Sequence, residues 1–273
     1  MFKNDIKKGL HTIDGLEVYC EYDLNGKPPI LLLHGFLSST YTFNLIIPIL
    51  QQNFSVIAID LPGFGRSEKS QSFIYSYRNY ACFIEKCADY FNLDELYVAG
   101  HSMGGQIALH MVEIMPERIN GIVLLGSSGY LKKSKKVWIY SSYLPFFDRF
   151  ISLYIQRVGV VNGMKNVLYN SSLVTDKHIE EFGKPLAEKN FYKVLARLLR
   201  YREGDLTSEQ LNKISLPVLL LWGKEDRVVP VHIGNRLAKD LQQAKLVIFD
   251  QTGHLLTEER PNEVCDAIID HCH

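Results

Sequence analysis

Hydrophobic residues form short continuous runs along most of this chain. Runs of this kind, without polar alternation, are typical of strands that are covered on both faces, as in a parallel sheet. Helical spacing of apolar residues separates most of the runs, for example over residues 75–92 and 232–241. Strands that alternate with helices predict an α/β fold with a mostly parallel central sheet and helices on both faces. The predicted strands are residues 30–33, 56–59, 97–99, 121–125, 217–221 and 245–249.

Two segments depart from this rhythm. Residues 11–23 alternate apolar and polar positions around Asp14 and Gly15, which predicts an N-terminal hairpin. Residues 128–213 contain no pattern of a buried strand and several short helical patterns rich in aromatic residues. We therefore expect residues 128–213 to form a helical cap, or lid. It would be inserted over an α/β core made of residues 1–127 and 214–273.

Composition and charge narrow the classes of function. The 273 residues are 47% hydrophobic and 22% charged, and their formal net charge is zero, which argues against a dedicated nucleic-acid-binding protein. The zero hides an uneven distribution, because the cap has fifteen Lys and Arg residues against eight Asp and Glu residues. The cap is therefore either a solvated basic face or a surface that attracts anionic ligands.

The same composition predicts where the protein works. No apolar run approaches ~18 residues and no signal-peptide pattern is present, so we expect a cytoplasmic protein without stable membrane insertion. The five cysteines contain no C-x-x-C pair, which predicts reduced thiols. No nucleotide-type glycine-rich loop is present, and we expect neither a cofactor nor a metal. The sequence carries no signal of an oligomeric state.

Ser102 is the most informative residue for chemistry. It lies in Gly100-His101-Ser102-Met103-Gly104, a Gly-x-Ser-x-Gly sequence between a predicted strand and a predicted helix. A serine on such a sharp turn projects its hydroxyl above the sheet, and the turn needs glycine at its flanking positions. The pattern predicts a nucleophilic serine.

A serine hydroxyl needs a neighbouring base, and the base needs a carboxylate that fixes its tautomer. His254 is the best base among the nine histidines because it follows a predicted strand, at the sheet edge where catalytic groups gather. Asp226 follows another strand end and is the preferred carboxylate, with Glu225 and Asp250 as alternatives. The order serine, acid, histidine along the chain fits this assignment.

The negative charge that develops during attack on a carbonyl needs backbone N–H donors. Met103 follows the serine directly and supplies one donor. The second is expected from Phe36, in the loop after the strand at residues 30–33. His34 and Gly35 of the same loop are expected to line the substrate site.

The motifs that carry these assignments are His34-Gly35-Phe36 and the segments 60–67, 100–105, 223–226 and 253–254. Together they resemble the α/β-hydrolase superfamily over nearly the whole chain. Within it they are most similar to serine hydrolases of the carboxylesterase and carbon–carbon bond hydrolase branch. The resemblance implies Ser102 as nucleophile, Asp226 as triad acid and His254 as base. It also implies that the N–H groups of Phe36 and Met103 form the oxyanion hole.

A serine in place of the aspartate that related dehalogenases and epoxide hydrolases carry favours acyl transfer. We therefore expect an enzyme that hydrolyses a small, partly apolar carboxylic ester through an acyl-enzyme intermediate. The basic cap keeps open a carbon–carbon bond hydrolase or lyase with an anionic, carboxylated substrate. Gln106 counts against a lyase of the menaquinone-pathway type, because the sequences that such a lyase resembles have arginine at this position. A non-enzymatic ligand-binding member of the fold is the third hypothesis.

Overall fold

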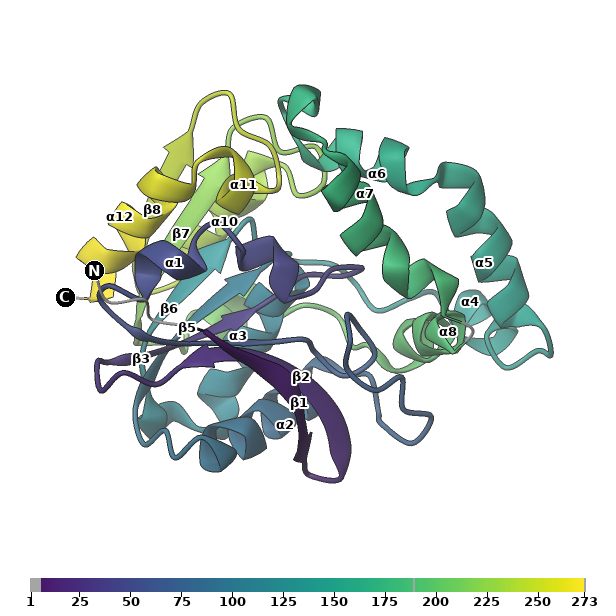
Figure 1. The fold of residues 1–273 in the computed structure, drawn as a ribbon, viewed down its shortest axis with the longest axis horizontal. Helices are drawn as coiled ribbons and strands as arrows, with labels where there is room; N and C mark the ends of the chain where they lie inside the picture. The colour runs from purple at the N-terminus through teal and green to yellow at the C-terminus, as the bar shows by residue number, and fades with distance from the viewer. Residues whose placement is uncertain (1–5, 189, 273) are drawn as a thin grey trace.

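The sheet is the organising element of the molecule. The structure is a computed structural model, and it describes residues 6–188 and 190–272 (Figure 1). Eight strands lie in the order β1-β2-β4-β3-β5-β6-β7-β8. The β1–β2 and β2–β4 pairs are antiparallel and all the other pairs are parallel. The strands are β1 (Lys7–Ile13), β2 (Leu16–Asp23), β3 (Pro29–Leu33), β4 (Ser55–Ile59), β5 (Leu96–His101), β6 (Ile119–Leu125), β7 (Pro217–Gly223) and β8 (Gln243–Phe249).

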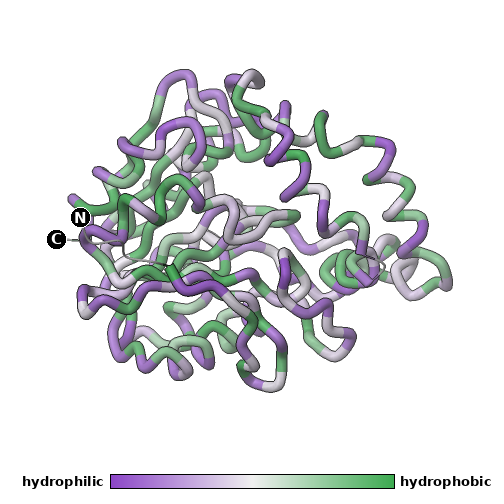
Figure 2. Tube along the Cα trace, in the orientation of Figure 1, coloured by the Kyte–Doolittle hydropathy of each residue, from purple (hydrophilic) through white to green (hydrophobic). Residues whose placement is uncertain are grey.

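Helices cover both faces of this sheet, which explains its continuous apolar runs. Along β3, Leu31 and Leu33 belong to one buried cluster, and Ile30 and Leu32 belong to another on the opposite face. Successive strand side chains point to opposite faces, so a strand that is buried on both sides has no polar position. The green interior of Figure 2 follows these strands. The covering helices are α1 (Ile47–Leu50), α2 (Tyr77–Tyr90), α3 (Met103–Ile114), α10 (Val231–Asp240), α11 (Leu256–Glu259) and α12 (Pro261–Cys272).

The predicted α/β architecture and the N-terminal hairpin are confirmed. The hairpin turns at Asp14 and Gly15, which have φ angles of 48° and 76°. Positive φ at both central residues matches the twist of the two flanking strands. No helix in the described part of the chain is long and apolar enough to cross a membrane.

Residues 128–213, which we expect to form the cap, contain helices and no strand among their described residues. Figure 1 shows the helices between residues 136 and 201 grouped on the right of the sheet. Helix α8 contacts both α4 and α5, and its residues Phe191 and Val194 belong to the main buried cluster, so the cap is packed onto the core. The cap helices are α4 (Lys136–Ser141), α5 (Phe147–Val158), α6 (Val160–Val167), α7 (Asp176–Gly183), α8 (Phe191–Tyr201) and α9 (Ser208–Leu211).

The two ends of the cap meet in a short stem. The backbone N–H of Asp205 donates to the carbonyl oxygen of Leu131 at 2.7 Å, and Leu131 N–H donates to the Asp205 carboxylate at 3.0 Å. Below them, the buried amide of Gln106 donates to Ser128 O and accepts from Leu206 N, at 2.7 and 3.1 Å. The outgoing and returning chains are therefore held together where they leave the core.

Candidate active site

Ser102 occupies the sharp turn between β5 and α3. Its φ and ψ are 52° and −115°, a backbone conformation that costs a non-glycine residue free energy and is found at functional turns. A Cβ atom added at Gly100 would lie 2.4 Å from Gly104 O, and one at Gly104 would lie 2.1 Å from Leu33 O. The predicted need for both glycines is confirmed. The turn leaves the serine partly exposed while its neighbours are buried.

His254 and Asp226 form a close buried pair. His254 Nδ1 lies 2.7 Å from Asp226 Oδ2. The other carboxylate oxygen of Asp226 accepts hydrogen bonds from the N–H groups of Val228 and Val229, both at 2.8 Å. A carboxylate can only accept, so the histidine carries its proton on Nδ1 and leaves the lone pair of Nε2 available. This is the tautomer that a general base requires.

The two alternative carboxylates have other partners. Glu225 accepts a hydrogen bond from the backbone N–H of Thr252 at 3.0 Å. Asp250 is exposed and forms a 2.6 Å ion pair with Lys224. The acid bonded to His254 is therefore Asp226, one of three acidic residues in neighbouring loops.

The loop after β3 approaches Ser102 closely. A Cβ atom at Gly35 would lie 3.0 Å from Ser102 Cβ, so only glycine fits without displacement. His34 Nε2 accepts the N–H of Leu61 at 2.9 Å, which leaves Nδ1 protonated to donate to Gly35 O at 2.7 Å. That carbonyl shares its peptide group with the N–H of Phe36, which points the opposite way in a trans peptide. His34 therefore fixes the direction of the Phe36 N–H.

His34 itself offers no group to a ligand. It is fully buried and both of its ring nitrogens are bonded within the protein. Burial lowers the pKa of His34 to about 4, so the ring stays neutral. Although we expected it to line the substrate site, its place in the structure is behind the loop, whose shape it supports.

Gly126 and His101 complete the surroundings of the His254–Asp226 pair, and of the two only His101 is expected from the sequence, as a packing residue. Gly126, directly after β6, has a φ of +51°, and a Cβ atom there would lie 3.3 Å from both Asp226 Oδ2 and His254 Nδ1. His101 packs against His254 with ring centroids 4.7 Å apart, and its Nε2 donates to His254 O at 3.0 Å. A glycine directly after a buried strand was the available signal for the first.

The cap also contacts the loop of His254. The carboxylate of Glu259 accepts the N–H of Gly253 at 2.6 Å and the N–H of cap residue Asn170 at 2.9 Å. From cap helix α7, the His178 ring lies 3.4 Å from the carboxylate of Glu258. The loop that carries His254 is thus held by contacts with the cap as well as with the core.

An aromatic wall extends from the Phe36 loop to the cap. The rings of Phe36 and Phe64 pack edge to face with centroids 6.0 Å apart, and Phe64 packs in the same way on Phe191 of α8 at 6.3 Å. Phe36 is half-exposed, so one end of the wall faces solvent. An apolar part of a ligand would find contact here.

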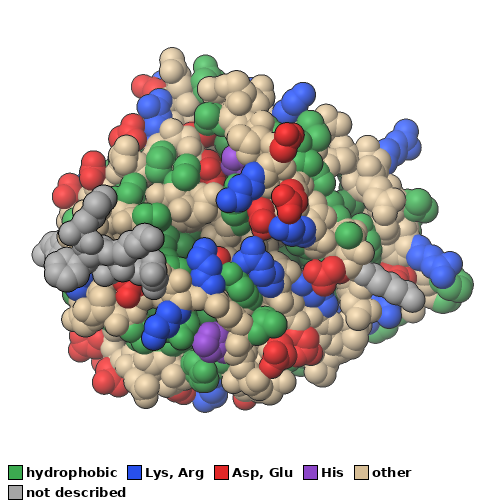
Figure 3. Space-filling view, in the orientation of Figure 1, with side chains coloured by type: hydrophobic (Ala, Val, Ile, Leu, Met, Phe, Trp, Pro, Cys, Tyr) green, Lys and Arg blue, Asp and Glu red, His purple; other side chains and the backbone are tan. Residues whose placement is uncertain are grey.

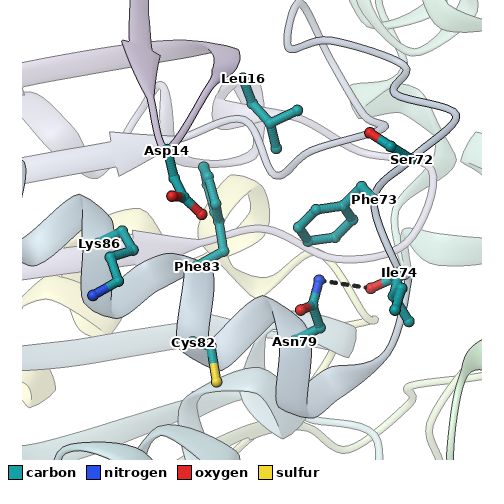
Figure 4. A pocket seen from close by; sticks show the side chains of 9 residues that line it. All are labelled: Asp14, Leu16, Ser72, Phe73, Ile74, Asn79, Cys82, Phe83 and Lys86. Carbon is teal, nitrogen blue, oxygen red and sulfur yellow. Dashed lines mark hydrogen bonds between the residues drawn. The ribbon is translucent and has the colours of Figure 1, made fainter.

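A cavity of about 320 Å³ lies away from these residues, between the β1–β2 turn and α2 (Figure 4). It contains no histidine among its lining residues, and Asn79 is already bonded to Ile74 O at 2.9 Å. It therefore lacks a histidine base of the kind that His254 provides beside Ser102. The lining residues are Asp14, Leu16, Ser72, Phe73, Ile74, Asn79, Cys82, Phe83 and Lys86.

Residues 28–261 match the family described as "alpha/beta hydrolase fold". The chain belongs to the α/β-hydrolase family. This α/β-hydrolase is 42% identical to the uncharacterized hydrolase YugF of Bacillus subtilis (strain 168), over 95% of both chains. It is 25% identical to the monoacylglycerol lipase ABHD6 of Mus musculus, over 89% of this chain and 75% of the relative. Like these relatives, the chain is a hydrolase.

Solved structures of the α/β-hydrolase family share the whole architecture. The 2-hydroxy-6-oxo-6-phenylhexa-2,4-dienoate hydrolase from Rhodococcus sp. strain RHA1 superposes with a TM-score of 0.79 over 98% of each chain, at 22% identity. At that identity the likeness establishes the fold alone. The similar proteins thus include one named as a monoacylglycerol lipase and one named as a dienoate hydrolase, and the substrate of this chain has to be argued from its own residues.

Proposed function

We propose that this α/β-hydrolase is a serine esterase that cleaves carboxylic esters through an acyl-enzyme intermediate. Ser102 is the nucleophile, His254 the general base and Asp226 the acid that orients it. The observation that carries the proposal is the 2.7 Å contact between His254 Nδ1 and Asp226 Oδ2, in a protein whose Ser102 lies on a strained strand-to-helix turn. The N–H groups of Phe36 and Met103 are the proposed oxyanion hole.

The reaction proceeds in two halves. Ser102 Oγ attacks the ester carbonyl carbon while His254 Nε2 takes the hydroxyl proton, and Asp226 stabilises the resulting imidazolium. The carbonyl oxygen becomes negative and is held by the two backbone N–H donors. The intermediate collapses, and the departing alcohol takes the proton from His254. Water then attacks the acyl carbon with His254 as base, which releases the acid and restores Ser102.

The surroundings favour an uncharged, partly apolar ester. The Phe36–Phe64–Phe191 wall offers aromatic contact to an acyl or alcohol chain. Cleavage of an anionic dienoate would need a cation that faces the site. The half-buried arginines of the cap are bonded to the protein: Arg197 Nη2 donates to Phe73 O while its buried Nε has no hydrogen-bond partner, and Arg200 donates to Ser142. Arg202 bonds to Lys132 O, and the described lysines of the cap are exposed.

Purified protein tests the proposal with short p-nitrophenyl esters and a fluorophosphonate probe. We expect turnover and covalent labelling, both abolished in Ser102→Ala and both retained in Ser172→Ala, a variant of an exposed cap serine. Wild-type protein that remains unlabelled would refute the serine mechanism. Cleavage of a vinylogous diketo acid together with poor ester turnover would instead support the carbon–carbon hydrolase hypothesis.

A further inference from the structure

Helix α5 of the cap is apolar on two different faces. Ile151 and Ile155 pack against the main buried cluster, and α5 lies against α8. Phe150, Leu153 and Tyr154 are spaced for a second face and are exposed. A surface helix of a water-soluble domain needs only one apolar face, so the second face requires a different explanation.

The second face continues through α4 and the turn that joins it to α5. We call this surface the α4–α5 face and define it by six large side chains whose exposed fractions lie between 56% and 70%. In Figure 1 the turn forms the right-hand end of the molecule, and Figure 2 colours it as hydrophobic. The six residues are Tyr140, Leu144, Phe146, Phe150, Leu153 and Tyr154.

The turn is held in place by α8. Arg200 Nε donates to Ser142 Oγ at 3.0 Å, and its guanidinium lies 3.7 Å from the centre of the Tyr143 ring. Ser142 is buried at this contact. The α4–α5 face is therefore presented by an anchored turn with defined contacts.

Positive charge is concentrated in the part of the chain that carries the α4–α5 face. Residues 131–167 contain seven Lys and Arg residues and one acidic residue, Asp148. All seven cations are exposed, and none of them forms an ion pair with another described residue. Figure 3 shows basic and hydrophobic side chains next to one another at the right-hand edge of the molecule.

We propose that the α4–α5 face docks on an anionic lipid surface. Large apolar and aromatic side chains bordered by lysine and arginine match the boundary between acyl chains and negative headgroups. A second copy of this chain fits less well, because a twofold interface would bring the same cationic surface against itself. In this mode the α4–α5 face rests on the membrane surface while the core stays in water. The binding does not depend on Ser102.

The two tryptophans make this testable in the unmodified protein. Trp138 lies in α4, the helix that contributes Tyr140 to the α4–α5 face, and is 48% exposed, whereas Trp222 is fully buried. With phosphatidylcholine vesicles that contain phosphatidylglycerol, Trp138 emission should shift to shorter wavelength and be quenched by brominated acyl chains. Trp138→Phe should abolish the shift and retain sedimentation with the vesicles. Absence of both shift and sedimentation at low salt overturns the proposal.

Paired variants separate the apolar and charged contributions. The double variant Phe150→Gln/Leu153→Gln should bind anionic vesicles at least about tenfold more weakly, because it removes two inserted side chains. The matched control Leu10→Gln/Leu24→Gln alters two exposed leucines near the β1–β2 hairpin and should bind normally. Equal binding by both double variants contradicts the proposal.

Replacement of Lys132 and Lys133 by glutamine should weaken binding by roughly fivefold per lysine, and salt should weaken wild-type binding. The control Lys239→Gln/Lys245→Gln removes two exposed lysines that lie outside the cap.

Sedimentation velocity supplies the remaining outcome. A dimer that dissociates in Phe150→Gln/Leu153→Gln, without vesicle binding by the wild type, would assign the face to a second copy and overturn the lipid proposal.

Discussion

The carbonyl oxygen of Val167, the last residue of cap helix α6, accepts a hydrogen bond from the backbone N–H of His254 at 2.7 Å. The next N–H along, from Leu255, points to the same oxygen at 3.2 Å. The end of a cap helix and the proposed catalytic base therefore share a direct backbone contact. A shift of α6 would therefore displace the backbone and the imidazole of His254 directly, without any intermediary side chain.

Glu259 should be a positioning residue for the base. Its carboxylate bridges the N–H groups of Gly253 and Asn170, so Glu259→Gln replaces one accepting oxygen with an amide donor. We expect kcat to fall about tenfold with little change in KM, since small displacements of a catalytic group reduce the rate. Steady-state kinetics with a p-nitrophenyl ester measures both. The control Glu263→Gln removes a partly exposed partner of Arg260 and should leave kcat unchanged.

Asp226→Asn should lower kcat by roughly 10³–10⁴-fold, because an amide favours the wrong histidine tautomer. Glu225→Gln and Asp250→Asn should lower it far less, since neither side chain contacts His254. Kinetic constants of the three variants at equal folded fraction decide the matter. Equal losses in Asp226→Asn and Glu225→Gln would contradict the assignment of the triad acid.

Gly126→Ala should reduce both activity and stability. The φ of +51° costs an alanine about 1–2 kcal/mol, and the new methyl group would lie 3.3 Å from Asp226 and His254. Gly159→Ala is a matched control, with a φ of +74° and no atom within 4 Å of the added Cβ. Both variants should unfold at lower urea concentration, and only Gly126→Ala should lose kcat. Equal kcat in the two variants would show that Gly126 does not shape the site.

The protein should lose stability in mild acid through buried neutral histidines. Burial lowers the pKa of His34 to about 4 and that of His101 to about 3. An unfolded histidine has a pKa near 6.5, so the unfolded chain binds more protons below that pH. Above pH 6.5 both histidines are mainly neutral in the folded and in the unfolded protein, so they do not lower its stability. Below pH 6.5 the free energy of unfolding falls by up to about 1.4 kcal/mol per pH unit for each histidine, until the pH reaches the folded pKa.

Asp60 opposes this effect and provides the control. Burial raises its pKa to about 6, so between about pH 4 and 6 the folded protein binds a proton there that the unfolded chain has lost. Its contribution therefore increases stability as the pH falls. Urea unfolding at several pH values from 6.5 to 4.5 should give a shallower slope for His101→Gln and a steeper slope for Asp60→Asn than for the wild type. Unchanged slopes in both variants would contradict the account.

The fold and the Ser102 turn could be predicted because their signals are local. Continuous apolar runs arise directly from burial of both faces of the sheet, and Gly100 and Gly104 are required by backbone atoms only 2.1–2.4 Å from an added Cβ. The sequence favours Asp226 but leaves Glu225 open, because adjacent residues differ only in the direction that the loop gives each side chain. The N–H groups of Val228 and Val229 hold the Asp226 carboxylate in place.

The cap limited prediction for a different reason. Helix α5 is apolar toward α8 and also toward solvent, so the hydrophobic period does not identify the side that is buried. The contact between Val167 and His254 joins segments that are distant in the sequence and uses only backbone atoms, which leave no side-chain signature. Gly126 had a visible signal, but its neighbours Asp226 and His254 lie in the loops that follow two other strands.

The stem at Leu131 and Asp205 makes the cap a replaceable part of the chain. The Leu131–Asp205 pairing encloses helices α4 to α8, so this part of the connection between β6 and β7 is closed at its base whatever its length. The entropy of closing a loop grows slowly with length, which lets insertions or exchanged helices enter beyond the stem with little effect on strand register. Chimeric proteins that exchange residues 132–204 would therefore inherit a new ligand preference while they keep the same sheet.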